Sequence, residues 1–116
     1  MKLPDFETLQ KVQKLHRLIC IATATILNVP KKTDGSPDPV AVFAVFYWFI
    51  PDMAGLEHYI DLVDDDELHD LLETEYNSFE TLKILVEGGV KKRTVISQTI
   101  EDLINSIKKL EELFGE

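Results

Sequence analysis

Residues 94–114, TVISQTIEDLINSIKKLEELF, carry apolar side chains that recur at alternating steps of four and three. The residues that keep this spacing are Ile96, Ile100, Leu103, Ile107, Leu110 and Phe114. Because an α-helix turns once in about 3.6 residues, the spacing aligns all of them on one helical face. We therefore predict a helix over 94–114 that buries this face against other helices of the chain. The alternative is that the 96–114 seam pairs with a second copy, as in a short coiled coil and a homodimer.

The same periodicity identifies two further long helices. In residues 5–28 the apolar face comprises Val12, Leu15, Ile19, Ala22 and Ile26, and in residues 66–87 it comprises Leu68, Leu72, Phe79, Leu82 and Val86. Asn28 ends the first of these helices, and Gly88-Gly89 ends the second, as glycine past the last helical turn commonly does.

Residues 38–63 contain two shorter helical segments. Asp38 is a favoured N-cap, and Pro39 suits the first helical position because its missing N–H would be unpaired there. The apolar run that follows predicts a helix over 39–50 that is buried on most sides. Its β-branched and aromatic residues also suit a strand, but no partner strand is visible in the sequence. Pro51 ends this segment, and a short helix follows over 52–63.

These segments predict an all-α, compact bundle of about five helices, over 5–28, 39–50, 52–63, 66–87 and 94–114. A chain of 116 residues is the size of one domain, so we expect a single helical domain over 1–116. The single Cys20 excludes an internal disulfide and favours a reducing, cytoplasmic setting, with the thiol buried and inert. No apolar run reaches the roughly 18 to 20 residues of a membrane span, so we expect no membrane association.

Charge is distributed unevenly along the chain. The formal net charge is −9, yet residues 33–82 hold thirteen acidic side chains and no Lys or Arg. Residues 1–32 carry a net charge of +4, and residues 83–116 are neutral. An acidic stretch of this kind serves as a solvated face, as a docking surface for a basic partner, or as a site for Mg²⁺ or Ca²⁺. Direct nucleic-acid binding is disfavoured, because phosphate contacts need Lys and Arg.

Function is predicted from this acidic stretch, because the sequence contains no phosphate-binding loop and no nucleophile motif. We expect a non-enzymatic interaction module with no catalytic residue and no cofactor, which binds a protein with a basic surface. An inhibitor, an immunity-type antagonist or a small subunit of an assembly would fit. The residues expected to bind the partner are Glu57, Asp61, Asp64, Asp65, Asp66, Glu67, Asp70 and Glu73.

The alternative function is a metal-dependent phosphohydrolase-type enzyme centred on His69. Asp66 lies three residues before His69 and Glu73 four after it, so both carboxylates share its helical face. With Asp70, these residues are the candidate metal ligands. His16, between Lys14 and Arg17, is expected at the surface or rim of its helix.

Aromatic residues gather where the acidic stretch begins: Phe43, Phe46, Tyr47, Trp48, Phe49 and Tyr59. The simpler expectation is that they belong to the core. The alternative is that they form a binding hot spot edged by acids, because Trp and Tyr are favoured at such spots.

Overall fold

A computed structural model describes residues 3–35, 37–88 and 93–115. Within this part of the chain the secondary structure consists of four α-helices and one 3₁₀ helix: α1 (Phe6–Leu27), α2 (Pro39–Met53), η1 (Leu56–Leu62), α3 (Asp66–Glu87) and α4 (Arg93–Phe114). No strand lies among these residues; the loop between α1 and α2 holds an isolated bridge between Lys31 and Pro37. The prediction of an all-α bundle of about five helices is confirmed.

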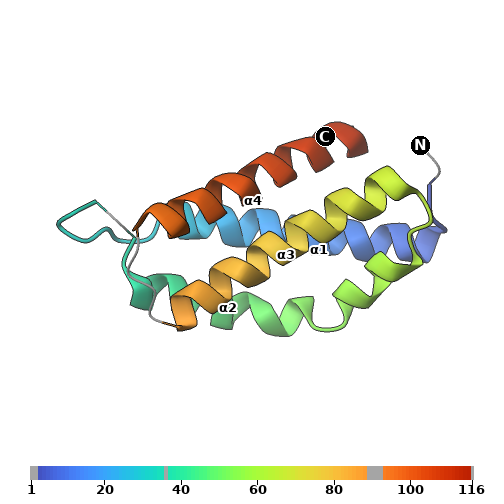
Figure 1. Cartoon of the computed structure of the whole chain (residues 1–116). Helices are drawn as coiled ribbons and strands as arrows, with labels where there is room; N and C mark the ends of the chain where they lie inside the picture. The colour runs from blue at the N-terminus through green and yellow to red at the C-terminus, as the bar shows by residue number, and fades with distance from the viewer. Residues whose placement is uncertain (1–2, 36, 89–92, 116) are drawn as a thin grey trace.

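The helices form an elongated bundle, 47 × 24 × 22 Å in extent. α1 and α3 run in one direction, and α2, η1 and α4 run in the other, so the start of α1 and the end of α4 lie at the same end of the bundle (Figure 1). α1 and α3 occupy the middle, with α4 on one side and α2 with η1 on the other (Figure 1). α1 contacts every other described element, whereas α2 packs mainly against α1 and α3. The outer side of α2 is therefore left without a neighbour in the described part of the chain.

Three aspartates begin the helices that the sequence predicted. Asp5 Oδ1 accepts a hydrogen bond from the backbone N–H of Thr8 at 2.8 Å, and this bond lowers the pKa of Asp5. Asp38 precedes Pro39 and caps α2, and Asp65 Oδ2 caps α3 by accepting from the N–H of Leu68 at 3.0 Å. Each carboxylate satisfies a backbone donor that has no partner within its own helix.

The predicted ends of the two short segments were wrong. Pro51 does not end α2, which continues to Met53, because a proline in the last turn disrupts few backbone hydrogen bonds. The chain then turns at Gly55, whose φ of 84° lies in the left-handed region that glycine adopts without strain. The next segment is a 3₁₀ helix of seven residues rather than an α-helix over 52–63.

No described helix alone has the length and apolar character needed to cross a membrane. α2 and η1 would meet those two requirements only as a pair, and their axes are bent by 59°.

The core is built from the predicted helical faces. All five apolar residues predicted for the α1 face are at most 1% exposed, as are four of the five predicted for α3, Val86 being partly buried. Phe46 of α2 meets Phe79 of α3 with ring centroids 4.9 Å apart. This pair joins the outer helix to the centre of the bundle.

The apolar seam of α4 is used within the chain. Leu103, Ile107 and Leu110 are buried in the common core, and the other seam residues are partly buried against it. α4 packs chiefly on α3, and its exposed positions are mostly polar. A homodimer through the 96–114 seam would have to replace this packing. The helix begins at Arg93, one residue before the predicted start at residue 94.

Replacing Phe46 by alanine should lower the free energy of unfolding by about 3–5 kcal/mol, because it empties a buried site against Phe79. Trp48→Ala, two positions along the same helix, should change it by less than about 0.5 kcal/mol because Trp48 is exposed. Urea unfolding followed by circular dichroism measures both. Equal losses in the two variants would contradict the described orientation of α2.

Candidate functional site

The outer side of α2 exposes apolar side chains. Val40, Tyr47 and Trp48 are 76%, 70% and 77% exposed, and Phe43 and Ala44 are exposed beside them. These residues recur at steps of three and four, so they form one continuous stripe, which we call the aromatic face (Val40, Phe43, Ala44, Tyr47 and Trp48). Phe43 and Tyr47 contact each other within it, with ring centroids 5.4 Å apart.

The expectation that these aromatics belong to the core was wrong for Phe43, Tyr47 and Trp48. Phe46 is buried, and Phe49 is partly buried. A helix with apolar residues on every side needs neighbours on every side, and among the described elements α2 packs mainly against α1 and α3. The unpartnered side favours the alternative expectation, a binding surface, because large exposed apolar patches are uncommon without a partner.

The acidic residues begin next to the aromatic face. η1 follows α2 and, like α2, packs against α1 and α3, so the outward surfaces of both elements lie on the same side of the bundle. η1 exposes Asp61 and also Leu62, which is 59% exposed. Acids and apolar groups therefore share this side.

The eight predicted partner-binding residues form what we call the acidic block (Glu57, Asp61, Asp64, Asp65, Asp66, Glu67, Asp70 and Glu73). Six of them are exposed, and Glu57 and Asp65 are partly buried. Asp61, Asp66 and Glu67 make no ion pair within the described residues, whereas Asp70 and Glu73 flank His69. Asp65 has a structural role as the N-cap of α3. Asp66 and Glu67 lie in the first turn of α3, where the helix dipole favours negative charge.

The candidate metal ligands around His69 are on the surface and spread apart. Asp70 Oδ1 lies 3.6 Å from His69 Nδ1, and Glu73 Oε2 lies 3.5 Å from His69 Nε2, on the other ring nitrogen. Among the described residues, the potential metal ligands whose atoms gather within 4.8 Å of one another are instead His16, Cys20 and Glu75. The hypothesis of a metal site at His69 stays a prediction, without converging ligand atoms to support it.

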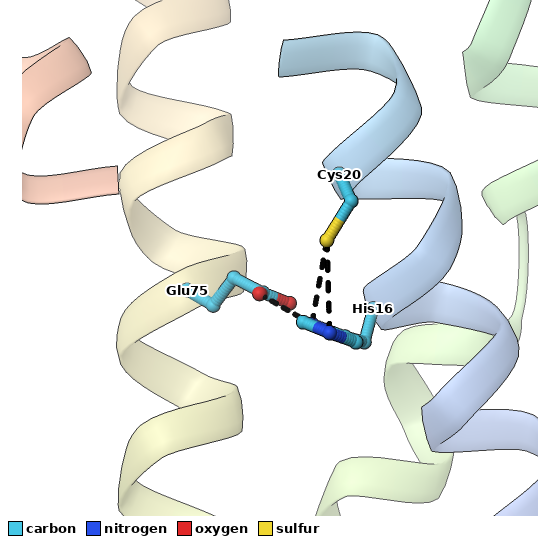
Figure 2. A group of neighbouring side chains, drawn as sticks. All are labelled: His16, Cys20 and Glu75. Atoms are coloured by element: carbon cyan, nitrogen blue, oxygen red, sulfur yellow. Dashed lines mark hydrogen bonds and ion pairs between the residues drawn. The ribbon is translucent and has the colours of Figure 1, made fainter. Parts of the chain in front are cut away.

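His16, Cys20 and Glu75 form a second site inside the bundle, which we call the His–Cys–Glu cluster (Figure 2). His16 and Glu75 are each 1% exposed, and His16 Nδ1 donates to Glu75 Oε2 at 2.8 Å between α1 and α3. Cys20 is one helical turn beyond His16 and is partly buried. Its Sγ lies 3.6 Å from His16 Nε2 and 3.8 Å from Nδ1, which places it over the ring (Figure 2). Phe114 of α4 contacts the same ring, with centroids 5.5 Å apart.

The expectation that His16 lies at the surface or rim of its helix was wrong, whereas Cys20, which was expected to be buried, is partly buried against the core. The sequence contained one signal that was missed. Glu75 occupies a position in the four-three spacing of the buried face of α3, between Leu72 and Phe79. A carboxylate at a core position requires a buried partner, and the only histidine on the apolar side of α1 is His16.

Burial alone would lower the pKa of His16, because it disfavours the imidazolium. Contacts with Cys20 and Glu75 outweigh this effect and raise the pKa of His16 to about 10. Burial raises the pKa of Glu75, His16 lowers it in part, and the carboxylate of Glu111 raises it further. The hydrogen bond holds one proton between the two groups, so their titrations are coupled.

The described surface also has an open pocket on α1, lined by Phe6, Gln10, Gln13 and the cations Lys11, Lys14 and Arg17. None of the cluster residues lines it. Lys11 also lies over the ring of Tyr59 on η1, 5.9 Å from its centroid, so the basic first helix packs beside the start of the acidic block.

The chain matches no known protein family, no curated protein and no solved structure. Its function is therefore argued from the aromatic face, the acidic block and the His–Cys–Glu cluster.

Glu75→Leu should destabilise the protein by about 3–5 kcal/mol, because it leaves His16 buried without its partner. The double variant His16→Leu/Glu75→Leu should recover most of that loss, since two apolar side chains of similar volume can replace a buried pair. Urea unfolding of wild type, both single variants and the double variant gives the coupling energy. A double variant whose loss of stability equals the sum of the two single losses would show that the pair is not coupled.

Stability should fall as pH rises from about 6.5 to 10. The folded-state pKa of His16 is raised from its ordinary value of 6.5 to about 10. The contribution of His16 to the free energy of unfolding is therefore fully present below pH 6.5, and it is lost as the pH rises from 6.5 to 10. The slope due to His16 is at most about 1.4 kcal/mol per pH unit.

His16→Gln is the matched control, because glutamine can still donate to Glu75 but does not titrate. Unfolding should be measured at pH 6.5 and 9.5 with a chelator and a reductant. Parallel pH profiles for the two proteins would contradict the assigned shift.

Proposed function

We propose that this protein is a non-enzymatic interaction module. It binds a partner protein that presents an apolar groove edged by Lys and Arg, through the aromatic face and the acidic block. The observation that carries the proposal is the exposure of Tyr47 and Trp48 on a helix side without a neighbour, next to a cation-free stretch of the chain.

The aromatic face supplies the expected source of affinity. Trp and Tyr bury large areas on binding and dominate binding hot spots, whereas scattered surface contacts contribute little. Trp48 and Tyr47 are neighbours in a rigid helix, and Phe43 contacts Tyr47, so little ordering is needed when a groove closes over them. An amphipathic helix laid in an apolar groove is a common recognition mode.

The acidic block supplies selectivity and steering. Residues 33–82 carry thirteen acids and no Lys or Arg, so their field attracts a basic surface and repels an acidic one. A second copy of this chain would bring the same acids against them if two aromatic faces met symmetrically. Charge complementarity therefore favours a different, basic protein as the occupant of this face.

Inhibitors, immunity-type antagonists and assembly subunits all fit this description. They share one requirement, a rigid surface that buries its anchor residues and repels wrong partners by charge. The proposal thus concerns the binding surface and the chemistry of its partner.

The experiment is quantitative affinity capture from source-cell extract with the tagged full chain, followed by mass spectrometry. We expect at least one protein to be recovered with wild type and to fall about 30-fold or more with Tyr47→Ala/Trp48→Ala, as the loss of a hot spot predicts. Asp61→Lys/Asp66→Lys/Asp70→Lys should also reduce its recovery, and high salt should weaken capture by wild type. Asp65 is left unchanged because its replacement would remove the N-cap of α3.

Ile84→Ser is the matched control, since Ile84 is a 63% exposed apolar residue on α3. Its captured proteins should equal those of wild type. Trp48 is the only tryptophan in the chain, so its emission should shift to the blue when the purified partner binds. Capture that is indifferent to both sets of variants, or binding that leaves Trp48 exposed to quencher, contradicts the proposal.

A further inference from the structure

The His–Cys–Glu cluster combines three residue types that bind transition metals. His16 offers an imidazole nitrogen, Cys20 a sulfur and Glu75 a carboxylate oxygen, and these atoms lie within 4.8 Å of one another. We propose that the cluster binds one divalent transition-metal ion of the zinc class. This inference is independent of the aromatic face and goes beyond the proposed interaction function.

The three types of ligand atom in the cluster determine which class of metal it suits. Mg²⁺ and Ca²⁺ prefer oxygen ligands throughout, whereas Zn²⁺ binds a mixture of nitrogen, sulfur and oxygen. With metal–ligand distances of about 2.0–2.3 Å and tetrahedral angles, ligand atoms around Zn²⁺ stand roughly 3.3–3.7 Å apart. In the cluster, Nδ1 of His16 is 2.8 Å from the Glu75 oxygen and 3.8 Å from the Cys20 sulfur. Movements of about half an ångström at these two contacts give the required spacing.

The helices hold the ligands in place. His16 and Cys20 are four residues apart on α1, so they project from the same side one turn apart. Glu75 approaches from α3 (Figure 2), and Phe114 of α4 packs against the His16 ring. One adjustment is needed, because Cys20 Sγ lies over the ring and a nitrogen lone pair lies in the ring plane. The imidazole must turn until one nitrogen points between the sulfur and the carboxylate oxygen.

Charge also balances at the site. The ion displaces the thiol proton of Cys20 and the proton shared by His16 and Glu75, and both protons go to solvent. The thiolate and the carboxylate then neutralise the two positive charges of the ion, so that no net charge is buried. Cys20 is the partly exposed member and offers the route of entry. Three protein ligands leave a fourth position for water.

The test is a titration of the full-length, reduced, metal-free protein, purified without a histidine tag, with Co²⁺. Binding should give a sulfur-to-cobalt charge-transfer band in the near ultraviolet, visible bands of tetrahedral intensity, and a stoichiometry of one. Zn²⁺ should remove all these bands by displacement. Cys20→Ser should abolish the charge-transfer band, and His16→Gln and Glu75→Gln should each weaken binding at least 10-fold.

His69→Gln is the matched control, because His69 also contacts two carboxylates but lies outside the His–Cys–Glu cluster, near the surface of α3. It should bind Co²⁺ as wild type does. The three cluster variants are nearly isosteric, and circular dichroism checks that each is folded. No charge-transfer band at millimolar Co²⁺, with a free thiol count of one, overturns the proposal. A spectrum that survives His16→Gln and Glu75→Gln, or one lost in His69→Gln, also overturns it.

Discussion

The hydrogen bond between His16 and Glu75 constrains how the two central helices meet. Both side chains are buried, and a buried ionisable group that loses its partner costs several kcal/mol. If α3 slid along α1 by one turn, about 5.4 Å, the bond would break and the buried carboxylate of Glu75 would lose its contact with His16. The apolar contacts around them, made by leucines and isoleucines of similar shape, discriminate less between such registers. The pair thus complements the apolar core by favouring one alignment of α1 and α3.

The other elements are arranged around this central pair of helices. α4 covers one side and reaches the His16 ring through Phe114, while α2 and η1 cover the other side. This arrangement leaves α2 with two neighbours, although its sequence is apolar all round. Its inner side is anchored by the contact of Phe46 with Phe79, and its outer side exposes Tyr47 and Trp48. The surface proposed for binding follows from a helix that has more apolar surface than the bundle can cover.

The two proposals concern different parts of the molecule with different chemistry. The aromatic face and the acidic block are exposed and fit a basic protein surface. The His–Cys–Glu cluster lies between α1 and α3 and fits a metal ion. A metal there would join α1 to α3 more firmly than the shared proton does, since coordination adds Cys20 as a third link. The outer surface of α2 would be unchanged, so stability and partner binding can be varied separately.

The sequence alone determined the helical fold and most of its core. The faces of α1, α3 and α4 were predicted residue by residue, because an amphipathic helix encodes its buried side in a spacing that needs no knowledge of its neighbours. The acidic block was identified in the same way, since the absence of Lys and Arg from 33–82 is a property of the chain itself. The cap at Asp38 is a local interaction and was also predicted from the sequence.

Only the tertiary structure decided which side of α2 is covered and which residue meets Glu75. A run that is apolar on every side, such as residues 40–50, contains no periodic signal to distinguish inside from outside, so its orientation depends on the number of neighbours. His16 and Glu75 are 59 positions apart, and no local pattern links them. Glu75 stands at an apolar position in the spacing of α3, which indicated a buried carboxylate. The partner of this carboxylate could be identified only after α1 and α3 had been placed side by side.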